Sequence, residues 1–160
     1  ITTTALSSGA AMVGHFTESF AYTGPTAGVR VQTNAADGGK IYSDRDFMFA
    51  SLPKELSGAD WVRNAQADSL YSAVDLMQIV VQAGTDVYIA HDDRLPTPPW
   101  LVNQFKATDL SFTVNGQTMK LFRHPAKQEG SITLGSNTDD ANVKEANAYI
   151  VFVNASAASK

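Results

Sequence analysis

The run His-Asp-Asp-Arg at positions 91–94 gathers more reactive side chains than any other part of this chain. An imidazole, two carboxylates and a guanidinium can bind a ligand, or they can pair with one another and pin a loop. The run follows the β-forming segment Asp86–Ala90 and precedes three prolines within 95–99, which force the chain off a sheet. Only 18% of the residues are charged, so this strand end is the first candidate for a functional site.

A second arginine, Arg45, lies between Asp44 and Asp46 in a segment that we expect to be a strand. Its side chain would then point away from both neighbours. Arginine holds a carboxylate or sulfate with two parallel hydrogen bonds. We therefore predict one polar site at a strand end, with Arg45 joining the 91–94 run. The site either binds a charged glycan or holds the fold, and for each arginine alone the structural role is favoured.

Aromatic residues are the other half of a sugar site, because a flat ring stacks on a sugar while polar groups bind its hydroxyls. Trp100 follows two prolines and precedes Leu101, which is typical of a loop anchor in the core. The candidate platforms are Trp61, Tyr88, Tyr42 and Trp100. We predict as the carbohydrate-binding set Arg45, Trp61, Asp92, Asp93 and Arg94.

Motifs of common enzyme classes are missing from the sequence. It has no Gly-x-Ser-x-Gly elbow, no phosphate-binding glycine-rich loop and no His-Glu-x-x-His motif. Sixteen acidic residues leave a glycosidase pair open, but no spacing favours one. Residues 91–93 are no transition-metal site on an extended strand, because neighbouring side chains point to opposite faces. We expect a binding module and not an enzyme.

A loop at 137–142 is the candidate for a structural calcium ion. Its oxygen-bearing side chains include Asn137, Asp139 and Asp140, and such ligands at alternating loop positions suit a hard cation. The loop lacks the glycine and terminal glutamate of an EF-hand, and a solvated polar turn is the favoured alternative. No other cofactor is expected.

Composition excludes several partners. The 160 residues have a net charge of −4 and no run of lysine or arginine, so we do not expect nucleic-acid binding. No apolar stretch has the length of a membrane span. Cysteine is absent, so there is no disulfide and no thiol chemistry. This composition fits a secreted bacterial domain that folds without oxidation.

The length is that of one domain. Because the chain starts at Ile1 and not at methionine, we expect a processed chain or a module excised from a multidomain protein. Residues 1–11 and 155–160 are rich in Thr, Ser and Ala, which is typical of linkers. This leaves 12–154 as a single module.

Short β-forming segments separated by turn signals recur along the module. Asn115-Gly116 is a strong hairpin signal between two of them. The pattern predicts an all-β fold, an antiparallel β-sandwich of jelly-roll type. The expected strands are Phe16–Tyr22, Gly28–Thr33, Lys40–Phe49, Asp60–Asn64, Asp86–Ala90, Leu110–Val114, Thr118–Arg123, Ser131–Leu134 and Ala148–Asn154.

One segment, Asp68–Val81, fits two structures. A helical period places apolar residues on one stripe, with Gly84 as a stop. Its second half, Leu76–Val81, is also dense in strand formers. We favour a strand, because the neighbouring segments are strands and Gly84-Thr85 would give a short turn into the next one. The stripe would consist of Leu70, Val74, Met77 and Val81.

The segments 42–49, 52–63, 86–101 and 130–135, taken together, resemble a β-sandwich accessory module of secreted bacterial polysaccharide-degrading enzymes. The similarity covers roughly 40–135, with 148–153 as a closing strand. The resemblance implies a jelly-roll-like fold and a carbohydrate-related role beside a lyase or hydrolase domain. It assigns no individual binding residue.

We therefore predict a non-catalytic carbohydrate-binding module that targets an attached polysaccharide-degrading enzyme to its glycan, which is neutral or acidic. The alternative is a structural or protein-interaction module that supports a neighbouring catalytic domain of the same chain. Either role places the protein outside the cell or at its surface.

Overall fold

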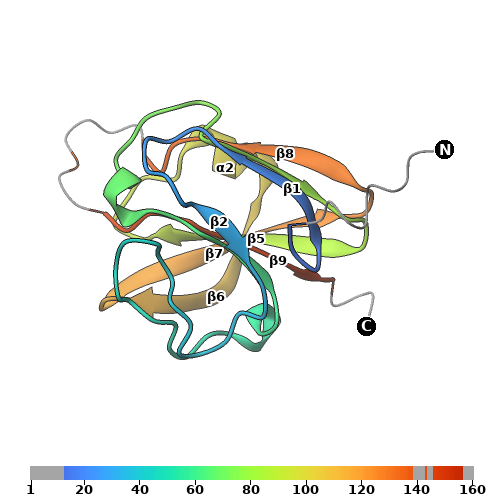
Figure 1. The fold of residues 1–160 in the computed structure, drawn as a ribbon, viewed down its shortest axis with the longest axis horizontal. Coiled ribbons are helices and arrows are strands. Elements are labelled where there is room, and N and C mark those ends of the chain that lie inside the picture. Colours follow the sequence, from blue (N-terminus) through green and yellow to red (C-terminus); the bar gives the residue numbers. More distant parts are fainter. Residues whose placement is uncertain (1–12, 139–142, 144–145, 157–160) are drawn as a thin grey trace.

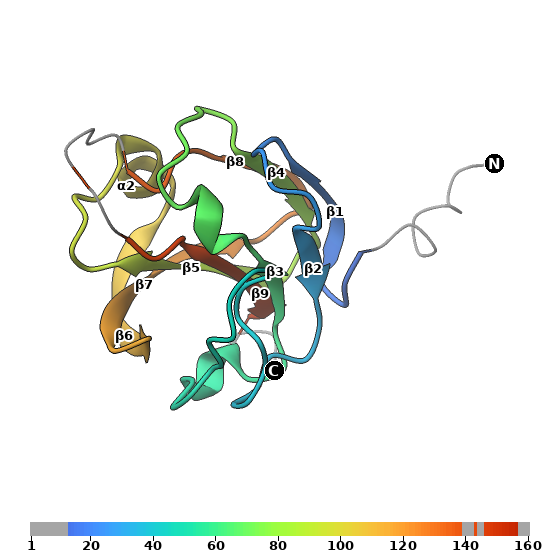
Figure 2. The ribbon, with the colours of Figure 1, turned by 60° about the vertical axis from the view of Figure 1, so that its left-hand side comes forward.

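The protein is an antiparallel β-sandwich of two sheets, seen in a computed structural model that describes residues 13–138, 143 and 146–156 (Figures 1 and 2). The smaller sheet has three strands in the order β1-β4-β8, and both neighbouring pairs are antiparallel. Their bounds are β1 Thr17–Tyr22, β4 Met77–Val81 and β8 Gly130–Leu134.

The larger sheet has six strands in the order β2-β3-β9-β5-β7-β6, again antiparallel throughout. Asn115 and Gly116 both have positive φ and form the predicted tight turn between β6 and β7. The predicted antiparallel β-sandwich is thus confirmed. The bounds are β2 Arg30–Gln32, β3 Asp60–Arg63, β5 Thr85–Asp92, β6 Lys106–Val114, β7 Gln117–Ala126 and β9 Ile150–Ala155.

Helix is scarce. The described residues contain one short α-helix, α2 at Pro99–Gln104, which begins with proline at its first position. Two 3₁₀ turns, η1 at Lys54–Leu56 and η2 at Gln66–Asp68, flank β3. None of the helices in the described part of the chain is long and apolar enough to cross a membrane.

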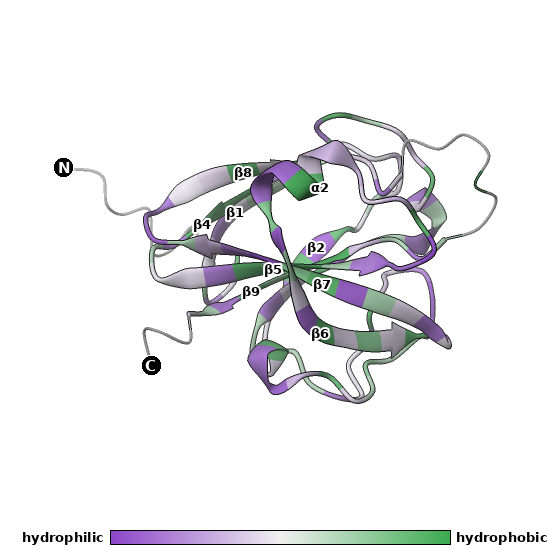
Figure 3. Cartoon of the chain, turned by 180° about the vertical axis from the view of Figure 1, so that it is seen from behind, coloured by the Kyte–Doolittle hydropathy of each residue, from purple (hydrophilic) through white to green (hydrophobic). Residues whose placement is uncertain are grey.

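Two hydrophobic cores lie on the two faces of the larger sheet. The first fills the space between the sheets and includes Val87 and Ile89. The second lies under the long connection 33–59 between β2 and β3, and includes Tyr88 and Ala90. All eight residues of β5 are buried for this reason. Toward the sheet edge β6 and β7 alternate between hydrophobic and hydrophilic residues, because one face there meets water (Figure 3).

The predicted strand Lys40–Phe49 is wrong. This segment forms turns, with one isolated bridge between Lys40 and Met48. The N–H of Ile41 donates to the carbonyl of Phe47 at 2.9 Å, so the chain reverses at the Ser-Asp-Arg-Asp sequence. The strand-like spacing of apolar residues arises because Ile41, Tyr42 and Phe49 point into the second core.

The ambiguous segment 68–81 is a strand in its second half, which forms β4. The first half is η2 followed by an irregular loop, 69–76. A helical stripe does not form, because Leu70 is 40% exposed and Val74 is 90% exposed. The preference for a strand is therefore correct only for Met77–Val81.

Asp60 anchors the beginning of β1. Its buried carboxylate accepts hydrogen bonds from the backbone N–H groups of His15 and Phe16 and from the hydroxyl of Thr17, at 2.8–3.0 Å. At the other end, Ala155 pairs with Thr85, so the last strand extends one residue beyond the predicted module boundary. The predicted linker 1–11 and residues 157–160 of the predicted tail lie outside the described residues.

Candidate functional site

The strand end at 91–94 is built around the carboxylate of Asp92, which is fully buried. Arg94 donates from Nε and Nη2 to the two oxygens of Asp92 at 3.1 and 2.8 Å. The backbone N–H groups of Arg94 and Asn147 add bonds of 2.9 and 2.8 Å. Arg94 therefore makes its two-pronged contact with a carboxylate of its own turn, and the bond from Asn147 to the same carboxylate ties the turn after β5 to the segment before β9.

The ionisation of Asp92 agrees with a structural pair. Burial opposes its charge, but the hydrogen bonds from Arg94 and the amide of Asn147 outweigh burial and hold the pKa of Asp92 below its ordinary value. The carboxylate is thus ionised at neutral pH. Four donors already occupy it, which leaves it poorly suited to receive a sugar hydroxyl.

His91 is also buried, at 2% exposure. Its Nε2 lies 2.8 Å from the carbonyl oxygen of Asn137. Burial lowers the pKa of His91, so the ring is neutral at neutral pH and Nε2 carries the proton that it donates. This hydrogen bond attaches the connection between β8 and β9 to β5.

The other two members of the predicted polar set do not join Asp92. Asp93 is exposed, and its carboxylate lies 3.8 Å from the ammonium group of Lys120. Arg45 sits in the 43–46 turn, donates to the carbonyl of Asp44 at 2.8 Å and lies 3.5 Å from its carboxylate. Arg45 is separated from the 91–94 turn because the segment around it is not a strand of the sheet.

Three of the four candidate aromatic platforms are closed to a ligand. Trp61 is 4% exposed, and its ring centroid lies 5.3 Å from that of Phe49 in an edge-on contact. Tyr42 and Tyr88 are buried in the same second core. A ring must be exposed to stack on a sugar, so Trp61 is not available for the role predicted for it.

The calcium prediction falls mostly outside the described residues, because Asp139 and Asp140 lie there. Asn137 is described and buried. Its side-chain amide donates to the carbonyls of Ser69 and Asn147 at 3.2 and 2.9 Å. Within the described part of the chain, no group of three His, Cys, Asp or Glu side chains is placed to hold a metal ion.

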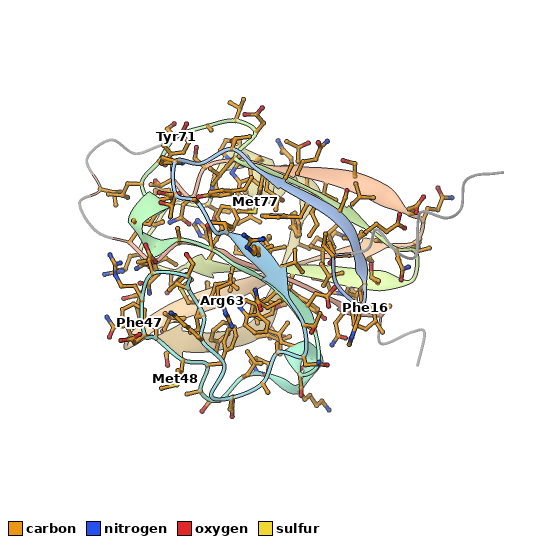
Figure 4. The ribbon with its side chains drawn as sticks, viewed as in Figure 1. Phe16, Phe47, Met48, Arg63, Tyr71 and Met77 are labelled. Carbon is orange, nitrogen blue, oxygen red and sulfur yellow. The ribbon has the colours of Figure 1, made fainter. Side chains whose placement is uncertain are left out.

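A pocket of about 230 Å³ lies between the loop 69–76 and the start of α2. One wall is the indole of Trp100, which is half-buried, and the exposed Val74 stands opposite in the loop. Tyr71 of the same loop is 40% exposed (Figure 4). The residues that line the pocket are Ser72, Ala73, Val74, Pro99, Trp100 and Ser136.

The Trp100 indole is held in one orientation. Its Nε1 donates to the carbonyl of Ser136 at 2.8 Å, and its centroid lies 5.3 Å from the ring of Tyr149. Gly135 lets the backbone approach the indole, since a Cβ there would lie 2.7 Å from Cδ1 of Trp100. The hydroxyl of Ser136 exchanges two hydrogen bonds with Ala73, at 2.6 and 2.8 Å. The two sides of the pocket are thus fixed to each other.

This pocket offers a rigid aromatic surface together with the exposed residue Ser72, whose hydroxyl can bind a sugar hydroxyl. The Ser136 hydroxyl is not available for this, because it is buried and already bonded to Ala73. The sequence indicated Trp100 as a candidate platform but favoured a role as a loop anchor in the core. In the structure the indole packs against Tyr149 and also lines the pocket. The sequence did not indicate that Val74 and Tyr71 are exposed, because the helical period assigned Val74 to a packed stripe.

Comparison with known proteins shows that the chain is similar to part of a larger enzyme. No family model matches the sequence. The chain is 30% identical over 134 residues to a β-glucuronidase of Formosa agariphila, an alignment that covers 84% of this chain and 14% of that protein. A solved structure of a β-glucuronidase from glycoside hydrolase family 2 superposes with a TM-score of 0.81 at 29% identity. The superposition covers 85% of this chain and 14% of that one.

The chain is therefore similar to one small, domain-sized part of a glycoside hydrolase, and spans 14% of the length of each protein that it matches. The agreement in backbone supports the β-sandwich assignment. It also supports the link to a carbohydrate-active enzyme that the sequence motifs implied.

Proposed function

We propose that the protein is a non-catalytic carbohydrate-binding module of a secreted polysaccharide-degrading enzyme, and that the Trp100 pocket receives the sugar. The observation that carries this proposal is the fixed, half-exposed indole in the wall of a pocket. Such a ring stacks on a sugar without losing side-chain freedom on binding. The similarity to one part of a β-glucuronidase supports a catalytic domain in the same polypeptide as the partner.

A catalytic role is not supported by the pocket. Glycoside hydrolysis uses two carboxylates about 5–9.5 Å apart on either side of the scissile bond. The pocket lining contains no acidic residue. The buried carboxylates of Asp60 and Asp92 are each occupied by at least three hydrogen bonds from the protein.

Affinity electrophoresis against neutral and acidic polysaccharides tests the proposal. The wild-type protein should be retarded by at least one polysaccharide, and Trp100→Ala should migrate as if that polysaccharide were absent. Met48→Ala is the matched control, because Met48 is 61% exposed on the connection 33–59 and should not affect retardation. Thermal melting of each variant separates lost binding from lost structure. Unchanged mobility of the wild type in every gel would rule out the proposal.

A protein contact is the second candidate for the same surface. Val74 lines the pocket and is 90% exposed, while Val102 of α2 and Leu70 of the loop 69–76 are 58% and 40% exposed. Exposed aliphatic side chains on the two elements that form the pocket favour a protein partner, and they offer a sugar little. In this case Val74→Asp and Val102→Asp should abolish binding to the catalytic domain of the same polypeptide, and leave polysaccharide retardation unchanged.

A further inference from the structure

Two arginines face each other across the short pair of strands at the edge of the larger sheet. Arg30 of β2 pairs directly with Arg63 of β3. Directly opposed residues of an antiparallel pair project from the same face, with Cβ atoms about 5 Å apart, and like charges at such positions destabilise a sheet. Arg30 is exposed and Arg63 is half-buried, so both guanidinium groups are accessible from solvent.

The side chain of Arg63 is fixed in place. Its Nε donates to the carbonyl of Lys40 at 3.0 Å, and its Cζ lies 5.3 Å from the ring centroid of Trp61. The indole face stabilises the cation without neutralising it. Lys40 is itself exposed, which brings a third cationic residue to the same edge. Figure 4 shows Arg63 on the near face, beside β2 and on the side of the 33–59 connection.

The same sheet contains a second cationic pair, which serves as an internal comparison. Lys106 of β6 is opposed to Arg123 of β7, and Arg123 forms an ion pair with the buried Asp86 at 3.0 Å. Neither Arg30, Arg63 nor Lys40 has a carboxylate within ion-pair distance among the described residues. In a chain with a net charge of −4, these three cations without an internal counter-charge form a positive edge that can attract an external anion.

We propose that Arg30, Arg63 and Lys40, the edge cation site, bind a sulfate or carboxylate group of an acidic polysaccharide. Two guanidinium groups projecting from one face can hold such a group by two-pronged hydrogen bonds. The site is separate from the Trp100 pocket, since β2 and α2 lie on opposite faces of the molecule (Figures 1 and 3). It rests on the proposed function only in taking a polysaccharide as the ligand.

Titration calorimetry at low ionic strength tests this proposal with four probes. Dextran and dextran sulfate share one backbone, polygalacturonate supplies carboxylates, and sodium sulfate supplies the free anion. We expect binding of dextran sulfate or polygalacturonate that weakens as salt rises, because the site is exposed. Arg30→Gln and Arg63→Gln should each lower that affinity about tenfold, the usual scale for a charged hydrogen bond.

Two controls make the result specific. Lys106→Gln removes the same charge at the opposite edge of the sheet and should change the affinity by less than about twofold. Arg30→Gln should leave the melting temperature unchanged or raise it, because it relieves repulsion with Arg63. A residue kept for stability would lower the melting temperature instead. Trp100→Ala should not affect binding of the anionic probes, which separates this site from the proposed pocket.

Four results would overturn the proposal. Dextran could bind as well as dextran sulfate, or neither acidic polysaccharide could bind. Lys106→Gln could cost as much affinity as Arg30→Gln, which would show a diffuse charge effect. Sodium sulfate could bind as tightly as the polysaccharides, which would show a site for the free anion alone.

Discussion

At the scale of single residues, the structure separates two arginines that look alike in the sequence. Arg94 is bound to a buried carboxylate, while Arg45 lies in an exposed turn against its own neighbour. We expect Arg94→Ala to lower the free energy of unfolding by roughly 2–3 kcal/mol, since it leaves Asp92 buried without its charged partner. Arg45→Ala should cost less than about 1 kcal/mol, as exposed ion pairs do. Urea denaturation of both variants checks this, and equal costs would contradict it.

The buried histidine makes stability depend on pH. The pKa of His91 is lowered by burial from an ordinary value of 6.5, so the unfolded chain takes up a proton at a higher pH than the folded protein. The stability contribution is complete above pH 6.5 and declines as pH falls below it, by up to about 1.4 kcal/mol per pH unit. Asp92, whose pKa is lowered from 3.8, contributes above that value and loses its contribution only in stronger acid.

Denaturant midpoints measured between pH 8 and pH 5 check this dependence. His91→Gln keeps a donor for the carbonyl of Asn137 and removes the titrating ring. The variant should show a flatter profile below pH 6.5 than the wild type. If both profiles coincide, His91 is not the group that sets the acid sensitivity.

The contact between Asp92 and Arg94 could be anticipated, because the two residues are two positions apart at a strand end. The position of Arg45 could not be anticipated, because it depended on whether Lys40–Phe49 was a strand. A loop that packs on a core can show the same alternation of apolar residues as a strand, so the pattern did not distinguish the two. The exposure of Trp100 depended on the loop 69–76, whose path no periodicity reveals.

At the scale of elements, the connection 33–59 determines how much of the larger sheet is open to a ligand. It covers the outer face of the larger sheet and forms a second core around Phe49. The ring of Phe49 lies 5.3, 5.7 and 6.1 Å from those of Trp61, Phe152 and Phe112. A ligand therefore cannot lie across this face of the larger sheet.

Two adjacent residues test whether that core supports the fold. Phe49→Ala should lower the free energy of unfolding by roughly 3–5 kcal/mol, because it leaves a cavity among three aromatic rings. Met48→Ala, one residue earlier and 61% exposed, should change it by less than about 0.5 kcal/mol. Chemical denaturation measures both. A small cost for Phe49→Ala would mean that the connection packs only loosely on the sheet.

At the scale of the whole molecule, the strand order and the arrangement of the layers could not be predicted from local sequence patterns. Alternation and the Asn-Gly turn predicted most strands and the sandwich class, because they report local backbone preference. They do not report which strand lies in which sheet. The apolar run of β9 is continuous and β5 is fully buried because both faces of the larger sheet are covered at these strands.

The central claim is that the Trp100 pocket binds a sugar, and the two tryptophan side chains of this protein provide a direct measurement. In a ¹⁵N-resolved NMR spectrum the indole N–H groups of Trp100 and Trp61 give one signal each. We predict that titration with oligosaccharides from the polysaccharide that retards the protein shifts the Trp100 signal in a saturable manner. The signal of Trp61, buried in the second core, should stay in place. A Trp100 signal that does not move with any oligosaccharide would contradict the assignment of this pocket as a glycan-binding site.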